Sequence, residues 1–142
     1  EKLKKQLLPE VKTKGNDYAH AILRGYVDSF GNSHPNYHYE DLQRVLALYN
    51  EKQLPNPAVI IDSNHSNSNK QYKQQIRIVK EVLHSRKLDG DIHKLVKGVM
   101  IESYIEEGCQ KITDGVYGKS ITDPCLGWED SKNLIYAIAE NC

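Results

Sequence analysis

Short apolar runs that stop abruptly at polar residues recur four times along the chain. They lie at residues 19–25 ("AHAILRG"), 58–65 ("AVIIDSNH"), 96–103 ("VKGVMIES") and 118–125 ("GKSITDPC"). Runs this short, rich in Val and Ile and without strict alternation, are typical of strands buried on both faces of a parallel sheet. The pattern therefore predicts four parallel strands.

The segments between these runs have helical periodicity. Apolar residues recur at helical spacing in 39–52, 70–85 and 129–141: Leu42, Val45, Leu46 and Tyr49 in the first, Tyr72, Ile76, Val79 and Leu83 in the second, and Leu134, Ile135, Ile138 and Ala139 in the third. Two prolines in 54–59 end the first helix, and Trp128 is expected to pack beneath the last one. Strands that alternate with helices predict an α/β fold with a parallel sheet.

Ionisable side chains follow each predicted strand. Arg24 ends the first run, Asp62 and His65 the second, Glu102 the third and Asp123 the fourth. In parallel α/β folds the carboxyl ends of the strands meet at one edge, where ligands bind. Unpaired buried charges cost several kcal/mol each, so packing alone is a poor explanation for four charged strand ends. We therefore expect a binding site at this edge.

Arg24 has two interpretations that the sequence leaves open. Its guanidinium could form a two-pronged contact with a phosphate or carboxylate, and Gly25 would let the chain approach closely. Alternatively, it forms a structural salt bridge with a neighbouring carboxylate.

His65, Glu102 and Asp123 are candidate ligands of a divalent metal. One imidazole with two carboxylates suits Mn, Fe, Co or Zn. The alternatives are a solvated or hydrogen-bonded His65, and mutual salt bridges among the strand-end charges. Asp62 could also bind metal, but an aspartate at a strand end more often caps a turn. Cys125, two residues after Asp123, remains open as a ligand or a nucleophile, although no sequence-adjacent base supports the latter.

Composition excludes several classes of protein. The 142 residues include 39% hydrophobic and 27% charged residues, with 19 basic and 19 acidic side chains and a net charge of zero. This balance argues against a general nucleic-acid or membrane-surface binder. No apolar run approaches the roughly 20 residues that span a bilayer, and the first ten residues do not resemble a signal peptide. Three widely spaced cysteines form no disulfide framework, which favours free thiols in the cytoplasm.

Several of these segments together resemble one enzyme family. "ILRG", "IDSNHSNSNKQ", "GVMIES" and "YGKSITDPCLGWED" are similar, in order and spacing, to the carboxyl-terminal half of metal-dependent class I 3-deoxy-D-arabino-heptulosonate 7-phosphate synthases. That family has a (β/α)8 TIM-barrel fold. It condenses phosphoenolpyruvate with erythrose 4-phosphate and releases phosphate at the start of the shikimate pathway, which leads to aromatic amino acids. The resemblance implies that residues 1–142 form one partial domain, strands five to eight of the barrel.

The resemblance also implies roles for single residues. Arg24 matches the arginine that binds the phosphate of phosphoenolpyruvate. His65, Glu102 and Asp123 match three of four protein ligands of the metal, which polarises the aldehyde of erythrose 4-phosphate as a Lewis acid. Asp123 could in addition contact the hydroxyls of the aldose, so Arg24, His65 and Asp123 are the expected catalytic residues.

The chain departs from the family pattern in its missing half. The fourth metal ligand, a cysteine, and the Lys-Pro-Arg-Thr segment for the aldose belong to the amino-terminal half of the family, and neither is found here. A complete barrel needs about 250 residues. We therefore expect a fragment that is inactive alone, with a hairpin at 7–17 where inhibitory amino acids bind in relatives. Exposed sheet edges predict a homo-oligomer. The alternative function is a non-catalytic metal- or phosphate-binding interaction module.

Overall fold

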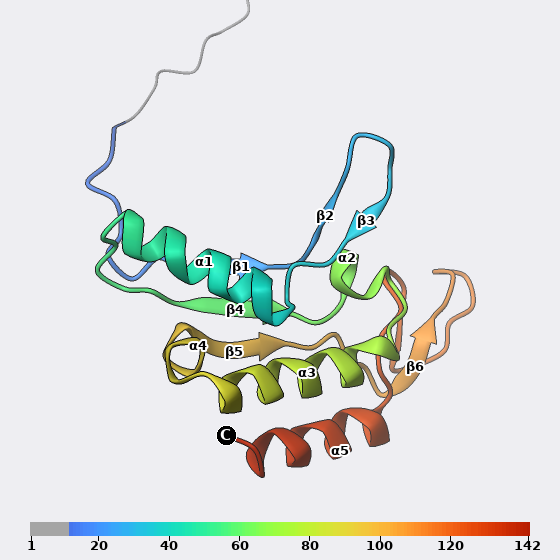
Figure 1. Cartoon of the computed structure of the whole chain (residues 1–142). Coiled ribbons are helices and arrows are strands. Elements are labelled where there is room, and N and C mark those ends of the chain that lie inside the picture. The colour runs from blue at the N-terminus through green and yellow to red at the C-terminus, as the bar shows by residue number, and fades with distance from the viewer. Residues whose placement is uncertain (1–11) are drawn as a thin grey trace, which may run out of the picture.

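A three-stranded parallel sheet forms the centre of the computed structural model, which describes residues 12–142 (Figure 1). Its strands are β1 (Ala21–Leu23), β4 (Val59–Asp62) and β5 (Val96–Met100), in the order β1-β4-β5. The register places Ile22 beside Ile60, and Ile60 beside Gly98. The predicted α/β fold with parallel strands is therefore confirmed.

Helices pack against one face of this sheet. They are α1 (Tyr39–Glu51), α3 (Gln74–Leu88) and α4 (Gly90–Leu95), and α5 (Trp128–Ala139) packs against α3. Val59 and Ile61 are fully buried in a core with Leu42 of α1, Ile78 of α3 and Ile92 of α4. Successive side chains of a strand point to opposite faces, so Val59 and Ile61 share the helix-covered face.

The opposite face of the sheet is open among residues 12–142. Ile22 is 47% exposed and Met100 is 44% exposed, while Ile60 between them is partly buried. The prediction that the strands are buried on both faces is therefore wrong for the chain as described. Its Val- and Ile-rich runs nevertheless retain apolar side chains on the uncovered face.

The predicted fourth strand does not join the central sheet. Only Lys119–Ser120 (β7) is extended, and it pairs in parallel with β6 (Glu106–Cys109). The Ser120 hydroxyl accepts a bond from the Thr122 backbone N–H at 3.2 Å and donates to the Asp123 carbonyl at 2.8 Å. These bonds turn the chain after Ser120, and Pro124 lacks a ladder N–H. One isolated bridge, Ser103 to Leu126, links the two regions.

The predicted helices agree with the structure apart from their ends. Residues 39–52 and 129–141 correspond to α1 and α5. The helix expected over 70–85 begins only at Gln74, because Asn69 and Lys70 have φ values of 51° and 58°, outside the right-handed helical region. Trp128 does not pack beneath α5, since 62% of it is exposed.

Two elements that the pattern did not predict shape the carboxyl edge of the sheet. A hairpin of β2 (Tyr26–Val27) and β3 (Ser33–His34) projects from the end of β1, and the short helix α2 (His65–Ser68) follows β4 (Figure 1). Residues 7–11 of the hairpin predicted at 7–17 lie outside the described part of the chain, and 12–17 contain no strand. Across residues 12–142, no helix combines the length and apolar character needed to cross a membrane.

Candidate metal centre

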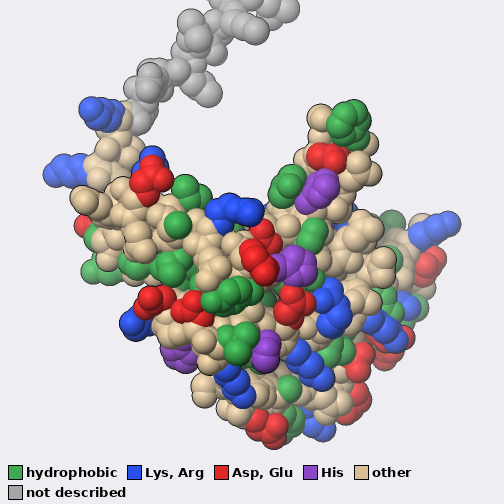
Figure 2. All heavy atoms as spheres, viewed as in Figure 1, with side chains coloured by type: hydrophobic (Ala, Val, Ile, Leu, Met, Phe, Trp, Pro, Cys, Tyr) green, Lys and Arg blue, Asp and Glu red, His purple; other side chains and the backbone are tan. Residues whose placement is uncertain are grey.

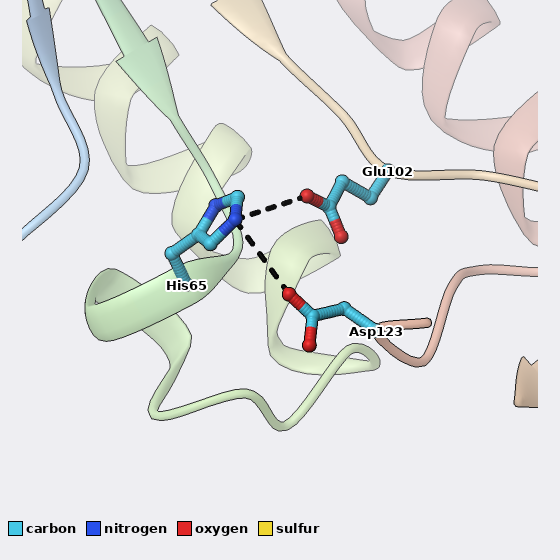
Figure 3. A group of neighbouring side chains, drawn as sticks. All are labelled: His65, Glu102 and Asp123. Atoms are coloured by element: carbon cyan, nitrogen blue, oxygen red, sulfur yellow. Dashed lines mark ion pairs between the residues drawn. The ribbon is translucent and has the colours of Figure 1, made fainter. Parts of the chain in front are cut away.

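Three side chains from separate elements converge at the carboxyl edge of the sheet. His65 begins α2, Glu102 follows β5 and Asp123 follows β7. The Nε2 atom of His65 lies 3.3 Å from Glu102 Oε1 and 3.7 Å from Asp123 Oδ2 (Figure 3). One ligand atom from each residue lies within 4.8 Å of the other two. The chain therefore brings together the three residues that the sequence proposes as metal ligands.

This arrangement fits a divalent cation. Ligand atoms about 2.1 Å from a common metal lie roughly 3–3.5 Å from one another, close to the two distances from His65 Nε2. Imidazole and carboxylate are ordinary ligands of first-row transition metals. Three protein ligands also leave coordination positions open, as catalytic metal sites require. The group can therefore hold a metal, whereas the identity of that metal stays a prediction.

The carboxylate of Glu102 is held by a buried amide. Asn64 is fully buried, and its Nδ2 donates to Glu102 Oε2 at 2.7 Å. The Oδ1 of Asn64 accepts a bond from the Ser68 hydroxyl at 2.7 Å, so both ends of the amide are engaged. This contact occupies Oε2 and leaves Oε1 directed at His65.

Asp62 contacts His65 directly. Its Oδ1 accepts the Asn64 backbone N–H at 2.9 Å, the turn-capping contact expected of an aspartate at a strand end. Its Oδ2 lies 2.8 Å from His65 Nδ1. It therefore contacts the opposite side of the ring from Glu102 and Asp123, and takes no part in the group of three ligand atoms.

Asp123 is flanked by a lysine and a cysteine. Lys70 Nζ lies 3.0 Å from Asp123 Oδ1, which leaves Oδ2 facing His65. The Cys125 thiol donates to the Asp123 carbonyl at 3.3 Å, and burial raises the pKa of this thiol. Cys125 is thus a protonated neighbour of the site, and its sulfur lies outside the group of converging ligand atoms in the described chain.

Arg24 lies in a cavity that adjoins the three ligands. The cavity has a volume of about 530 Å³, and its lining includes Arg24, Lys70, His65 and Asp123. Within residues 12–142 no carboxylate lies within ion-pair distance of Arg24, so the salt-bridge alternative lacks a partner there. Acidic side chains gather beside a histidine near the base of the projecting hairpin (Figure 2). The cavity combines two cations with a candidate metal site.

A second and larger hollow lies away from these groups. This groove has a volume of about 890 Å³ and is lined mainly by apolar and aromatic side chains, among them Tyr104, Tyr117, Trp128 and Ile135. None of the three converging ligands, nor Arg24, contributes to its lining. The smaller cavity is the candidate active site, because two of the three converging ligands, His65 and Asp123, line it together with Arg24.

Sequence reasoning missed the contacts of three residues at the site. Lys70 and Gln75 received no role, although a lysine that follows a Ser- and Asn-rich loop is a reasonable anion-binding candidate. The Ser and Asn neighbours of His65 were expected to hold His65 and shape the turn, whereas the Asn64 side chain contacts Glu102. The side-chain amides of Asn64 and Gln75 offered no comparable indication in the sequence that they contact Glu102. Their contacts with Glu102 join residues 38 and 27 positions apart, and such pairs become visible only in the folded chain.

A family comparison identifies the chain's relatives. The sequence model of the DAHP synthetase I family matches residues 2–135, nearly the whole chain. The chain belongs to this family. The family assignment made from the sequence motifs is therefore confirmed.

Individual relatives agree with this assignment. A phospho-2-dehydro-3-deoxyheptonate aldolase of Haemophilus influenzae is 42% identical over 133 residues, which cover 92% of this chain and 34% of the relative. A Trp-sensitive phospho-2-dehydro-3-deoxyheptonate aldolase of Buchnera aphidicola is also 42% identical, over 89% of this chain and 34% of the relative. The solved structure of the Francisella tularensis aldolase is 32% identical, with a TM-score of 0.77 over 91% of this chain and 36% of that one. The chain spans about a third of these relatives.

Proposed function

We propose that this chain supplies the metal site and one phosphate-binding group of a phospho-2-dehydro-3-deoxyheptonate aldolase. That enzyme condenses phosphoenolpyruvate with erythrose 4-phosphate to give 3-deoxy-D-arabino-heptulosonate 7-phosphate and phosphate. The observation that carries the proposal is the convergence of His65, Glu102 and Asp123 in a chain of this family. Two of these residues, His65 and Asp123, line the cavity that also contains Arg24.

Each residue has a distinct role in this proposal. His65, Glu102 and Asp123 are the protein ligands of a divalent cation, with Mn, Fe, Co and Zn as the candidates. When bound, such a cation polarises a carbonyl oxygen and so makes an aldehyde more electrophilic. Arg24 binds the phosphate of phosphoenolpyruvate through its planar guanidinium. Asp123, in the lining of the cavity, also contacts the hydroxyls of the aldose.

Lys70 extends the proposed phosphate site. It lines the same cavity as Arg24, and its ammonium lies 3.0 Å from Asp123 Oδ1. An ammonium there can neutralise part of the charge of a bound phosphate while it holds the Asp123 carboxylate in place. Two cations beside a metal site suit a substrate that carries both a carboxylate and a phosphate, as phosphoenolpyruvate does.

Binding of phosphoenolpyruvate to the Mn(II)-loaded chain tests the anion site. We expect Arg24→Ala to weaken binding at least tenfold, since an arginine–phosphate contact contributes about 1.5–3 kcal/mol. Arg44→Ala is the matched control, because Arg44 lies on α1 and pairs only with Asp41 within the described chain. Equal affinities of the wild type and the Arg24 variant would refute the assignment of Arg24.

A non-catalytic metal- or phosphate-binding module is the second candidate function. Its support is a group of side chains that can hold a metal, beside a cavity that contains the cations Arg24 and Lys70. Release of inorganic phosphate from both substrates with Mn(II), abolished by Glu102→Ala, would identify the chain as an enzyme. Metal binding without any turnover is compatible with both candidates. We expect this result for the isolated chain, because positioning of both substrates needs further groups.

The partial-barrel organisation also remains a proposal. We propose that residues 1–142 correspond to strands five to eight of a (β/α)8 barrel and that copies associate through the open sheet face around Ile22 and Met100. Multi-angle light scattering at increasing concentration tests this association, and a monomer throughout would contradict it.

The three cysteines are unpaired, which fits the proposed cytoplasmic location.

A further inference from the structure

The carboxylate of Asp62 uses both of its oxygens at the base of the site. Asp62 is the last residue of β4, and only 6% of its side chain is exposed. Its Oδ1 accepts the Asn64 N–H at 2.9 Å, and its Oδ2 lies 2.8 Å from His65 Nδ1. Because the first contact fixes the carboxylate against the turn, the second presents a stationary acceptor to the imidazole ring.

An ionised carboxylate accepts hydrogen bonds but cannot donate them. The Nδ1 of His65 must therefore carry the proton in its contact with Asp62. In a neutral ring, this leaves the lone pair on Nε2, the nitrogen that faces Glu102 Oε1 and Asp123 Oδ2. The opposite tautomer would place a hydrogen where a cation must bind.

The backbone of His65 has an unusual conformation, and the main chain of Asp62 is held close to it. Its φ is +46°, in the left-handed region that residues with a Cβ rarely adopt. The Asp62 carbonyl meanwhile accepts a bond from Asn67 Nδ2 at 2.7 Å, which holds the strand end against α2. Asp62 thus anchors both the ring of His65 and the turn that carries it.

From these contacts we infer that Asp62 is a positioning residue that selects the metal-binding tautomer of His65. The inference rests on the proposed function, since it assumes that His65 binds a metal through Nε2. Carboxylates that orient a metal-binding histidine typically change metal affinity about 10- to 100-fold when they are replaced. We expect a loss of that size for Asp62→Asn.

The chain offers a closely matched control in the β2–β3 hairpin. Asp28 Oδ2 lies 2.8 Å from His34 Nε2, and Asp28 Oδ1 accepts the Phe30 N–H at 2.9 Å. The spacing to the backbone donor is two residues, as it is from Asp62 to Asn64. His34 has no other carboxylate partner within residues 12–142. Asp28→Asn therefore removes an equivalent pair without touching the metal site.

The experiment compares Mn(II) affinity by calorimetry for the wild type, Asp62→Asn, Asp62→Glu and Asp28→Asn. We expect Asp62→Asn to bind about 10- to 100-fold more weakly, Asp62→Glu to recover part of the loss and Asp28→Asn to stay within about twofold of the wild type. A folded Asp62→Asn variant with wild-type affinity would overturn the inference.

Nitrogen NMR of the histidine rings in the metal-free chain gives a second, independent readout. At about pH 8, where an ordinary imidazole is neutral, His65 of the wild type should carry its proton on Nδ1. Asp62→Asn should shift the proton toward Nε2, while Asp28→Asn should leave the tautomer of His65 unchanged. A wild-type His65 protonated on Nε2 overturns the inference even if Asp62→Asn does not fold. Failure of the wild type to bind Mn(II), with the Nδ1 tautomer present, would instead refute the proposed metal site alone.

Discussion

The side-chain amide of Gln75 forms hydrogen bonds with both the backbone N–H and the backbone carbonyl of Glu102. The Oε1 of Gln75 accepts the Glu102 N–H at 2.8 Å, and its Nε2 donates to the Glu102 carbonyl at 3.0 Å. Gln75 lies on α3 and is fully buried, so the helix behind the sheet fixes the residue that follows β5. The Ser63 hydroxyl donates to the Met100 carbonyl at 2.7 Å and lies 3.1 Å from the same Oε1, which places the end of β4 beside this contact.

Gln75→Leu is therefore expected to destabilise the chain by about 1–3 kcal/mol, because it leaves the Glu102 N–H without its acceptor. The Glu102 carbonyl still accepts the Leu126 N–H, and the Ser63 hydroxyl still donates to the Met100 carbonyl. It should also weaken metal binding, since Glu102 loses its backbone anchor. Gln74→Leu is the control, because the Gln74 side chain bonds only the exposed Arg77 within the described chain. Urea unfolding of both variants checks the prediction, and equal stabilities would contradict it.

Gly25 is expected to tolerate no side chain. Its φ is +72°, and a Cβ there would lie 2.6 Å from the His34 carbonyl oxygen and 2.8 Å from the Asn67 nitrogen. Gly31 has a similar φ of +87° but open space around it, with no described atom within 4 Å of an added Cβ. Gly31→Ala should cost about 1 kcal/mol for its backbone conformation alone, and Gly25→Ala about 2 kcal/mol more from the clash.

Thermal unfolding of the two glycine variants distinguishes the effects. The Gly25 variant should also bind phosphoenolpyruvate more weakly, because the neighbouring Arg24 must move with the displaced backbone. A Gly25→Ala chain as stable as Gly31→Ala would mean that the hairpin can shift freely relative to α2.

The two faces of the central sheet should respond differently to truncation. Ile61 is fully buried against the helices, whereas Ile22 is 47% exposed on the open face. We expect Ile61→Ala to cost about 3 kcal/mol and Ile22→Ala less than about 1 kcal/mol, when unfolding is measured at a concentration where the chain is monomeric. Equal costs for both variants would show that the open face is covered in solution.

The three cysteines should separate into two classes of reactivity. Cys109 and Cys142 are exposed, whereas Cys125 is buried, and burial raises the pKa of its thiol. Because the thiolate is the reactive form, a thiol reagent at neutral pH should modify two cysteines quickly and Cys125 slowly. Mass spectrometry of the modified peptides identifies the slow site. Rapid modification of Cys125 would contradict its burial beside Asp123.

The sequence predicted those features of the fold that follow from local pattern. Helical spacing of Leu42 and Val45 located α1, and short apolar runs located the three strands of the sheet. The predicted fourth strand is shorter than expected and does not join the central sheet, because the Ser120 hydroxyl bonds the following backbone and turns the chain. A side chain that competes for backbone partners leaves no trace in hydrophobic periodicity.

The candidate site was predictable only in part. A parallel sheet places the residues after its strands at one edge, which explains why His65 and Glu102 could be expected to lie together. Asp123 lies there as well, although its strand does not join the sheet. The contacts that orient these ligands were not predictable, because the buried amides of Asn64 and Gln75 reach Glu102 across long stretches of sequence.

Titration of the chain with Mn(II), followed by calorimetry, tests the central claim most directly. We expect one metal ion to bind per chain with an affinity in the micromolar range, and His65→Ala to abolish this binding. His84→Ala is the control, since His84 is an exposed residue of α3 outside the ligand group. Absence of binding to the wild type, or equal binding by the His65 variant, would contradict the claim that His65, Glu102 and Asp123 hold a metal.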